Sequence, residues 1–88
     1  MSEYKVLSLP SPIYEEDIPR IVEMLFDKAM VETKDRSPEL CCSNLEKRYE
    51  ECGVWEEALL DFIHRICRYR LISVDRGTYY FKEIFAND

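Results

Sequence analysis

Four cysteines and one histidine have the most distinctive chemistry in this 88-residue chain. His64 and Cys67 are three residues apart, a spacing that on a helix lets both side chains ligate one metal ion, and Cys52 with Cys41 or Cys42 would complete a tetrahedral zinc site. Structural zinc sites usually take their ligands in close pairs from turns, however, and three of these cysteines fall on apolar stripes, where cysteine acts as a small hydrophobic residue. We therefore expect no metal and no cofactor, with a zinc-stabilised module as an alternative.

Catalytic motifs have little support. The single histidine excludes the two-histidine zinc-protease motif, and the two glycines are too far apart to form a phosphate-binding loop. A nucleophilic pair of Cys67 and His64 would place the thiol on the buried side of a helix, where an apolar environment raises its pKa and makes it inert. We expect a protein that is not an enzyme and has no catalytic residues.

The charged side chains are divided unevenly along the chain, whose net charge is −6. Residues 1–62 carry 7 basic and 15 acidic side chains, whereas residues 63–88 carry 5 basic and 3 acidic ones. An acidic body repels polyanions at long range, although a local basic patch can hold one at short range. No apolar run approaches the roughly 20 residues that cross a bilayer, and the start has no hydrophobic stretch, so we predict a cytoplasmic protein with free thiols and no membrane partner.

Apolar residues at helical spacing predict three helices. Asp17 is the expected cap of the first, with Pro19 in its first turn. Ser37 and Pro38 begin the second helix in the same way, and Gly53 ends it. The apolar stripes are Ile18, Ile21, Val22, Leu25, Phe26, Ala29 and Met30 in the first helix, Cys41, Leu45, Tyr49 and Cys52 in the second, and Trp55, Ala58, Leu59, Phe62, Ile63, Ile66 and Cys67 in the third.

A β-hairpin is predicted after the third helix. The run LISV is followed by a three-residue loop, Asp75–Gly77, and then by TYYFKEIF; glycine at the end of such a loop accepts the left-handed backbone that it needs. Residues 1–16 are expected to form an extended segment ahead of a single domain at 17–88.

This order of helix, connector, helix, tight turn, helix and hairpin resembles the winged helix-turn-helix family over about residues 17–85. The resemblance rests on the order of the elements and on the glycines at 53 and 77. It implies an α+β fold: a three-helix winged helix-like domain with a C-terminal β-hairpin and a short N-terminal extended segment. In DNA-binding members the third helix reads the major groove with its N-terminal residues, and the hairpin reaches phosphates.

Mapped onto this chain, the base-reading positions hold Glu56, Glu57 and Asp61. Three carboxylates at this place would face repulsion from the phosphates that any direct base contact must overcome. The same face could instead occupy a basic nucleic-acid channel of another protein, because it offers the negative field that such a channel attracts. A solvated helix surface is the competing interpretation.

The alternative function is a dimeric DNA-binding transcriptional regulator. It requires Arg65, Arg68, Arg70 and Arg76 to form one phosphate-binding strip, a mode that carries no sequence information. The competing interpretation is that Arg65 pairs with Asp61 and that the other arginines are solvated.

The hairpin aromatics complete the set of candidates. Tyr79 and Phe81 project to one face of the second strand and Tyr80 to the other. Because one layer of helices buries only one face of a sheet, we expect aromatic surface to remain for a partner. The alternative is that the N-terminal segment covers this surface. We expect a small non-enzymatic interaction or regulatory module, by analogy a virus- or phage-encoded modulator of a nucleic-acid-handling complex, that binds another protein or its own copy. The predicted partner-binding residues are Tyr79, Tyr80, Phe81, Arg76, Glu56, Glu57 and Asp61.

Overall fold

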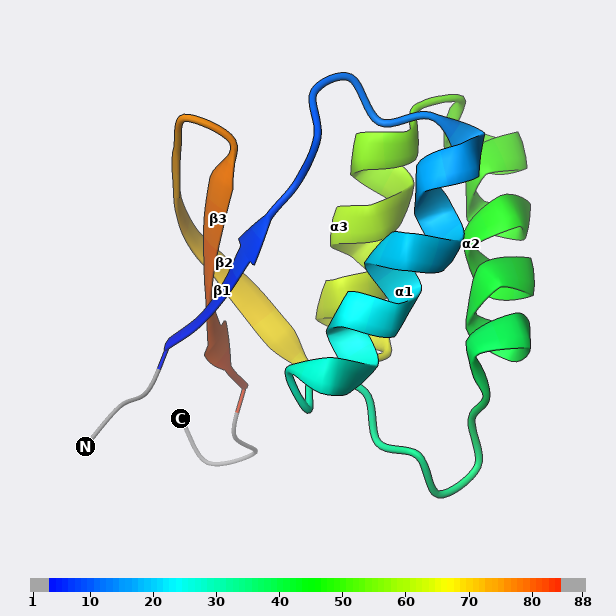
Figure 1. Cartoon of the computed structure of the whole chain (residues 1–88), viewed down its shortest axis with the longest axis horizontal. Helices are drawn as coiled ribbons and strands as arrows, with labels where there is room; N and C mark the ends of the chain where they lie inside the picture. Colours follow the sequence, from blue (N-terminus) through cyan, green and yellow to red (C-terminus); the bar gives the residue numbers. More distant parts are fainter. Residues whose placement is uncertain (1–3, 85–88) are drawn as a thin grey trace.

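Three helices and a three-stranded antiparallel sheet form two layers, with all three helices on one side of the sheet (Figure 1). The computed structural model describes residues 4–84. The chain is therefore of the predicted α+β class with a C-terminal hairpin. In chain order the elements are β1 (Tyr4–Ser8), a short 3-10 helix (Glu15–Asp17), α1 (Ile18–Asp27), α2 (Pro38–Cys52), α3 (Trp55–Arg65), β2 (Tyr69–Asp75) and β3 (Thr78–Glu83).

The first helix is shorter than its apolar stripe predicts. α1 ends at Asp27, and Ala29 has a positive φ of 56°, so the chain turns before the predicted end at Met30. Met30 is nevertheless buried, and its N–H donates to the Leu25 carbonyl at 2.9 Å. Asp17 is the N-cap residue of α1, as predicted, but its side chain makes no capping hydrogen bond to the helix. Its carboxylate instead accepts from the Tyr14 N–H at 3.0 Å and so holds the preceding 3-10 turn.

The second helix begins and ends as predicted. The Ser37 hydroxyl accepts from the Leu40 N–H at 3.1 Å, and Gly53 has φ 76°, the left-handed conformation typical of the residue after a helix. Of the predicted stripe, Cys41 and Leu45 are fully buried. Tyr49 is only half-buried and Cys52 is exposed, because the chain reverses at Gly53 and the end of α2 lies at the edge of the core.

The sheet has the order β1-β3-β2, so β1 and β2 are both edge strands. β1 does not fold across the outer face of the hairpin; it extends the sheet beside β3, in a register that runs from Tyr4 opposite Lys82 to Ser8 opposite Thr78. Residues 4–8 of the N-terminal segment therefore belong to the same sheet as the hairpin.

The hairpin loop has two residues and not the three predicted. Asp75 pairs with Thr78, and both Arg76 and Gly77 have positive φ, 51° and 80°, which is the conformation of a type I′ turn. The Gly77 carbonyl accepts from the Leu9 N–H at 3.0 Å, so the loop is also attached to the chain that leaves β1.

The core lies between the sheet and the helices. It is built from one side of β1 and β3, from Tyr69 at the start of β2 and from the inward faces of the three helices, so the same contacts position the hairpin against α3. Within residues 4–84, no helix combines the length and the apolar character that a membrane crossing requires. The largest fully buried side chains are Phe81, Leu7, Ile21, Leu25, Met30, Leu45, Leu59, Ile63, Val22 and Cys41.

Candidate interaction surface

The hairpin aromatics lie on the two faces of the sheet. Tyr79 and Phe81 are 7% and 1% exposed, and they belong to the hydrophobic core beneath the helices. Tyr80 points to the opposite face and is half-buried. Burial therefore removes Tyr79 and Phe81 from the predicted partner-binding set, because the helix layer covers their face of the sheet, and leaves Tyr80 on the other.

The first turn of α3 is tied to the hairpin through one of its carboxylates. The Tyr79 hydroxyl donates to Oε2 of Glu56 at 2.7 Å, across 23 residues of sequence. Burial, together with this hydrogen bond to the negatively charged carboxylate, raises the pKa of Tyr79 to about 12. Glu56 thus has a structural contact that the sequence does not indicate, whereas Glu57 in the same turn is exposed.

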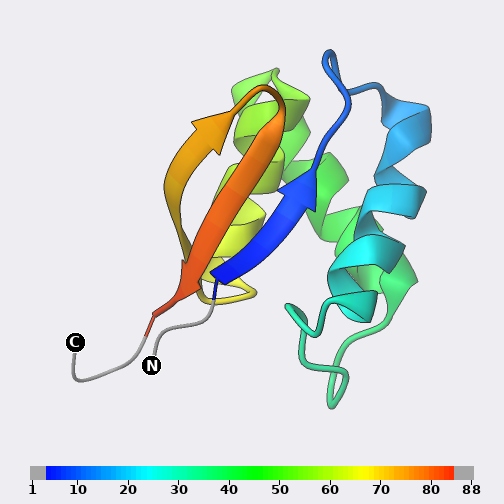
Figure 2. The ribbon, with the colours of Figure 1, turned by 60° about the vertical axis from the view of Figure 1, so that its left-hand side comes forward.

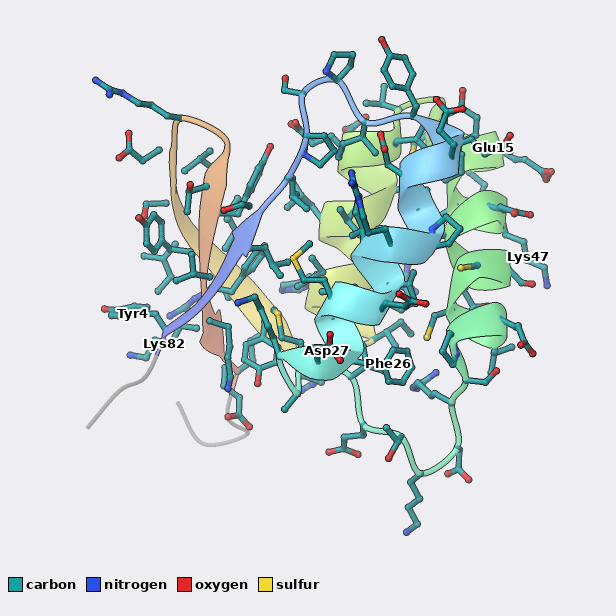
Figure 3. The ribbon with its side chains drawn as sticks, viewed as in Figure 1. Tyr4, Glu15, Phe26, Asp27, Lys47 and Lys82 are labelled. Atoms are coloured by element: carbon teal, nitrogen blue, oxygen red, sulfur yellow. The ribbon has the colours of Figure 1, made fainter. Side chains whose placement is uncertain are left out.

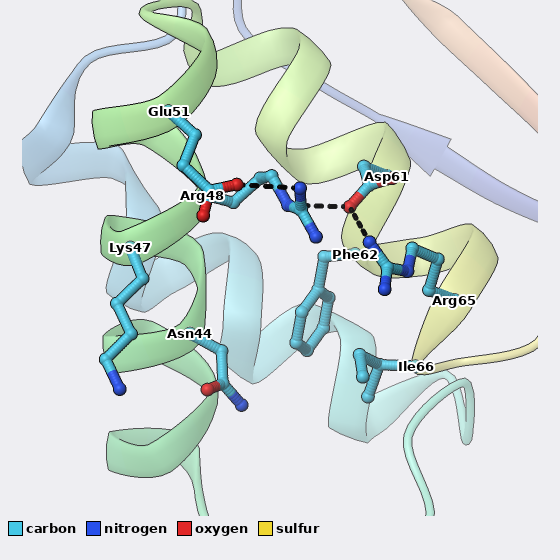
Figure 4. Close-up of a pocket in the computed structure, with 8 residues that line it drawn as sticks. All are labelled: Asn44, Lys47, Arg48, Glu51, Asp61, Phe62, Arg65 and Ile66. Atoms are coloured by element: carbon cyan, nitrogen blue, oxygen red, sulfur yellow. Dashed lines mark hydrogen bonds and ion pairs between the residues drawn. The ribbon is translucent and has the colours of Figure 1, made fainter.

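Asp61 takes part in ion pairs that link α2 to α3 (Figure 4). Its carboxylate lies 2.9 Å from Nε of Arg48 and 3.8 Å from Nη1 of Arg65, and Arg48 also contacts Glu51 at 2.8 Å. The competing interpretation from sequence, that Arg65 pairs with Asp61, is confirmed. Asp61 is therefore not a free carboxylate on the outer face of α3.

A groove of about 290 Å³ lies beside these ion pairs. The side chain of Phe62, which is 4% exposed, and that of Ile66 give it an apolar floor, and Lys47 and Asn44 stand on the α2 side (Figure 4). Its charges largely offset one another, because the carboxylates of Glu51 and Asp61 face the cations of Arg48 and Arg65 in the same groove.

The four arginines of the alternative function are not in one strip. Arg65 and Arg68 line a common cleft at the end of α3, together with the carboxylates of Glu32 and Glu83. Arg70 is opposite Lys82 in the sheet, on the face that points away from the helices. Arg76 is in the hairpin loop, six residues and about 20 Å along the strand from Arg70.

The four thiols differ in their exposure to solvent. Cys41 and Cys67 are buried, and burial raises the pKa of Cys67 to about 12. Cys42 is half-buried, while Cys52 is exposed and its thiol donates to the Val54 carbonyl at 3.4 Å. All four cysteines are free, and residues 4–84 contain no group of three or more histidine, cysteine or acidic side chains placed to hold a metal ion.

The most exposed apolar side chains of the hairpin are on β2. Leu71, Ile72 and Val74 are 37%, 44% and 50% exposed. β2 is at the edge of the sheet beside β3, with no further strand beyond it among residues 4–84 (Figure 2). On the outer face, Tyr4 and Lys82 lie side by side and point away from the helices (Figure 3).

These three β2 residues are absent from the set predicted from sequence. The run LISV predicts a strand, and its three apolar residues within four positions, without alternation, indicate that one face cannot bury them all. In the structure the register shifts by one residue between Leu71 and Ser73, so Ile72 is the inserted residue of a β-bulge, and Leu71 and Val74 lie on the same face of the sheet.

No family model, no curated protein and no solved structure matches this chain.

Proposed function

We propose that this chain is a non-enzymatic protein-interaction module of winged helix-like fold, and that its partner binds along the free edge of strand β2. The observation that carries the proposal is the exposure of Leu71, Ile72 and Val74 on an edge strand. An edge strand offers backbone N–H and C=O groups to another chain, and exposed apolar side chains beside them add area for contact.

The charges favour a polypeptide partner over nucleic acid. The arginines needed for a phosphate strip are divided between a cleft at the end of α3, the outer face of the sheet and the hairpin loop. Arg65 already contacts Asp61, and the first turn of α3 presents Glu56 and Glu57 where a groove-reading helix meets DNA. β2 itself carries one positive and one negative residue, Arg70 and Asp75, so it presents a neutral surface.

The test compares two lysine substitutions of exposed apolar residues. Val74→Lys places a charge on the edge of β2, which opposes strand addition, whereas Leu40→Lys makes the same change of charge on α2, at a residue of similar exposure. The tagged chain is purified from its native cells at moderate salt. We expect Val74→Lys to lose the co-purified protein and Leu40→Lys to keep it; equal recovery with both variants would contradict the proposed surface.

A titration with duplex DNA tests the regulator alternative directly. Binding through phosphate contacts weakens steeply as salt rises. We expect no binding at low salt, and a measurable affinity with a steep salt dependence would replace the interaction module with the DNA-binding regulator.

A further inference from the structure

The free edge of β2 exposes backbone groups at positions that the register defines. In an antiparallel pair, alternate residues direct their N–H and C=O groups toward the partner strand or away from it. Asp75 and Thr78 flank the two-residue hairpin loop, and the pair in that position exchanges hydrogen bonds. The preceding residue, Val74, therefore directs its N–H and C=O to the free edge.

The same alternation can be counted from the other end of β2. The Ile84 N–H donates to the Arg68 carbonyl at 2.9 Å, so Leu71, three residues after Arg68, also directs its N–H and C=O to the free edge. Because Ile72 is inserted as a bulge, two residues separate Leu71 from Val74, where a regular strand has one. A regular strand cannot form backbone hydrogen bonds with both Leu71 and Val74, because its own outward-directed groups have one residue between them. A second β2 that runs antiparallel can, because it has the same two-residue spacing.

The charges of β2 are also complementary to themselves. Arg70 lies opposite Lys82 within the sheet, a like-charge pair that destabilises an isolated chain. Among residues 4–84, neither Arg70 nor Asp75 takes part in an ion pair. In an antiparallel pairing that sets Leu71 opposite Val74, Arg70 comes opposite Asp75 on the outer face, and by symmetry this pair forms twice.

The helix layer leaves room for such a neighbour. Leu71 and Val74 point to the helix side of the sheet, since they lie opposite Phe81 and Tyr79, yet they remain 37% and 50% exposed. The helices therefore stop short of this edge (Figure 2). In the symmetric pairing each of these side chains would lie beside its counterpart from the other copy and cover part of that surface.

We propose that the partner at β2 is a second copy of this chain, joined antiparallel about a two-fold axis with Leu71 opposite Val74 and Arg70 opposite Asp75 of the other copy. The inference rests on the proposed function, because it names the occupant of the same surface. The two sheets then form one six-stranded sheet. The spacing of the free backbone groups on one β2 matches that on the other, and Arg70 of each copy pairs with Asp75 of the other.

Disulfide trapping tests the register. The chain with Cys52→Ser, which removes the exposed native thiol, carries Arg70→Cys and Asp75→Cys together. These two positions form a non-hydrogen-bonded pair across the proposed interface, with Cα atoms about 4.5 Å apart, within the range of a disulfide. Within one copy they are five residues apart, about 16 Å along the strand, so no bridge forms inside a chain.

The matched control is Arg70→Cys with Ser73→Cys in the same background. Both residues are on the outer face of β2, but in the proposed register neither is opposite the other. We expect the first variant to form a covalent dimer under mild oxidation and the control to remain monomeric on a non-reducing gel. Equal cross-linking of the two variants, or none in either, overturns the register.

Charge exchange tests the pairing by sedimentation equilibrium. Arg70→Asp and Asp75→Arg each place like charges opposite one another twice, and we expect each to raise the dimer dissociation constant about tenfold, whereas the double variant restores it. Net charge alone predicts otherwise, since Arg70→Asp changes it by two units from −6 to −8 and Asp75→Arg changes it by two units from −6 to −4. A weaker dimer for Arg70→Asp with a stronger one for Asp75→Arg would refute the pairing.

The two proposals fail separately. Circular dichroism and thermal unfolding establish that each variant is folded before its mass is measured. The wild-type chain could stay monomeric at its highest soluble concentration while Val74→Lys still loses a different co-purified protein. That result would overturn the proposal of a second copy and would still support the interaction module. Loss of neither the dimer nor the co-purified protein in Val74→Lys overturns both.

Discussion

Replacing Tyr79 with phenylalanine tests how the hairpin is held against α3. The substitution keeps the buried ring and removes the hydroxyl that donates to Glu56 at 2.7 Å. A hydrogen bond to a charged group contributes about 1.5–3 kcal/mol, but Glu56 is exposed and its carboxylate regains water when the donor is lost, so we expect about 1 kcal/mol. For a domain of this size that loss lowers the unfolding temperature by about 4–8 °C.

Tyr80→Phe is the matched control for this substitution. Tyr80 is the next residue on the same strand, and its hydroxyl takes part in no hydrogen bond among residues 4–84. We expect Tyr80→Phe to change the free energy of unfolding by less than about 0.5 kcal/mol. A double-mutant cycle of Tyr79→Phe with Glu56→Ala, which removes the acceptor, should give a coupling energy of about 1 kcal/mol. Equal stability of Tyr79→Phe and Tyr80→Phe would refute the role assigned to the hydroxyl.

The pKa of Tyr79 adds a second, independent measurement. Its pKa is raised to about 12 in the folded chain from an ordinary value of 10, so the folded state favours the neutral phenol. The corresponding stability is fully present below pH 10 and is lost as pH rises through 12, because the unfolded chain releases its proton first. The difference in stability between the wild type and Tyr79→Phe should therefore shrink between pH 10 and pH 12 in urea titrations, and a constant difference would show that the phenol does not respond to burial.

Substitutions at two further positions test the connection of α2 to α3. Gly53 has φ 76°, and the space that a Cβ would occupy there is open, with no contact within 4 Å. Gly53→Ala should therefore lower the free energy of unfolding, measured by urea titration, by about 1 kcal/mol through backbone strain alone. Gly53→Asn should lower it by less, since asparagine tolerates this conformation. Asp61→Asn removes the ion pairs to Arg48 and Arg65. Because the Asp61 side chain is about a third exposed, the free energy of unfolding should fall by at most about 1 kcal/mol. Thermal unfolding should show no difference from the wild type in 1 M salt, where the screening length is about 3 Å.

The elements of this fold could be predicted because local signals define them. Ser37 and Gly53 mark the two ends of α2 through a hydroxyl acceptor and a left-handed backbone, and both act through neighbours a few residues away. The end of α1 has no such signal. Ala29 takes a positive φ although alanine disfavours it, so the apolar stripe continues past the point where the helix stops.

The site could not be predicted to the same extent, because it depends on contacts between distant elements. The carboxylate of Asp61 is neutralised by Arg48 from another helix, and that of Glu56 accepts from a hydroxyl 23 residues away. Which face of the hairpin is buried follows from the position of the helix layer, and alternation alone does not decide between Tyr79 and Tyr80. The bulge at Ile72 is also invisible in sequence, since an inserted apolar residue extends an apolar run without interrupting it.

The acidic start of α3 has a structural explanation that shifts attention to the sheet. A carboxylate in the first turn of a helix is favoured by the helix dipole, and Glu56 also holds Tyr79, so its presence requires no partner. β2 differs, because its apolar exposure, the position of Arg70 opposite the like-charged Lys82 and its irregularly spaced free backbone groups all disfavour an isolated chain. A bound strand would relieve all three at once, and this coincidence at one edge makes β2 the part of the molecule where a partner would stabilise the chain most.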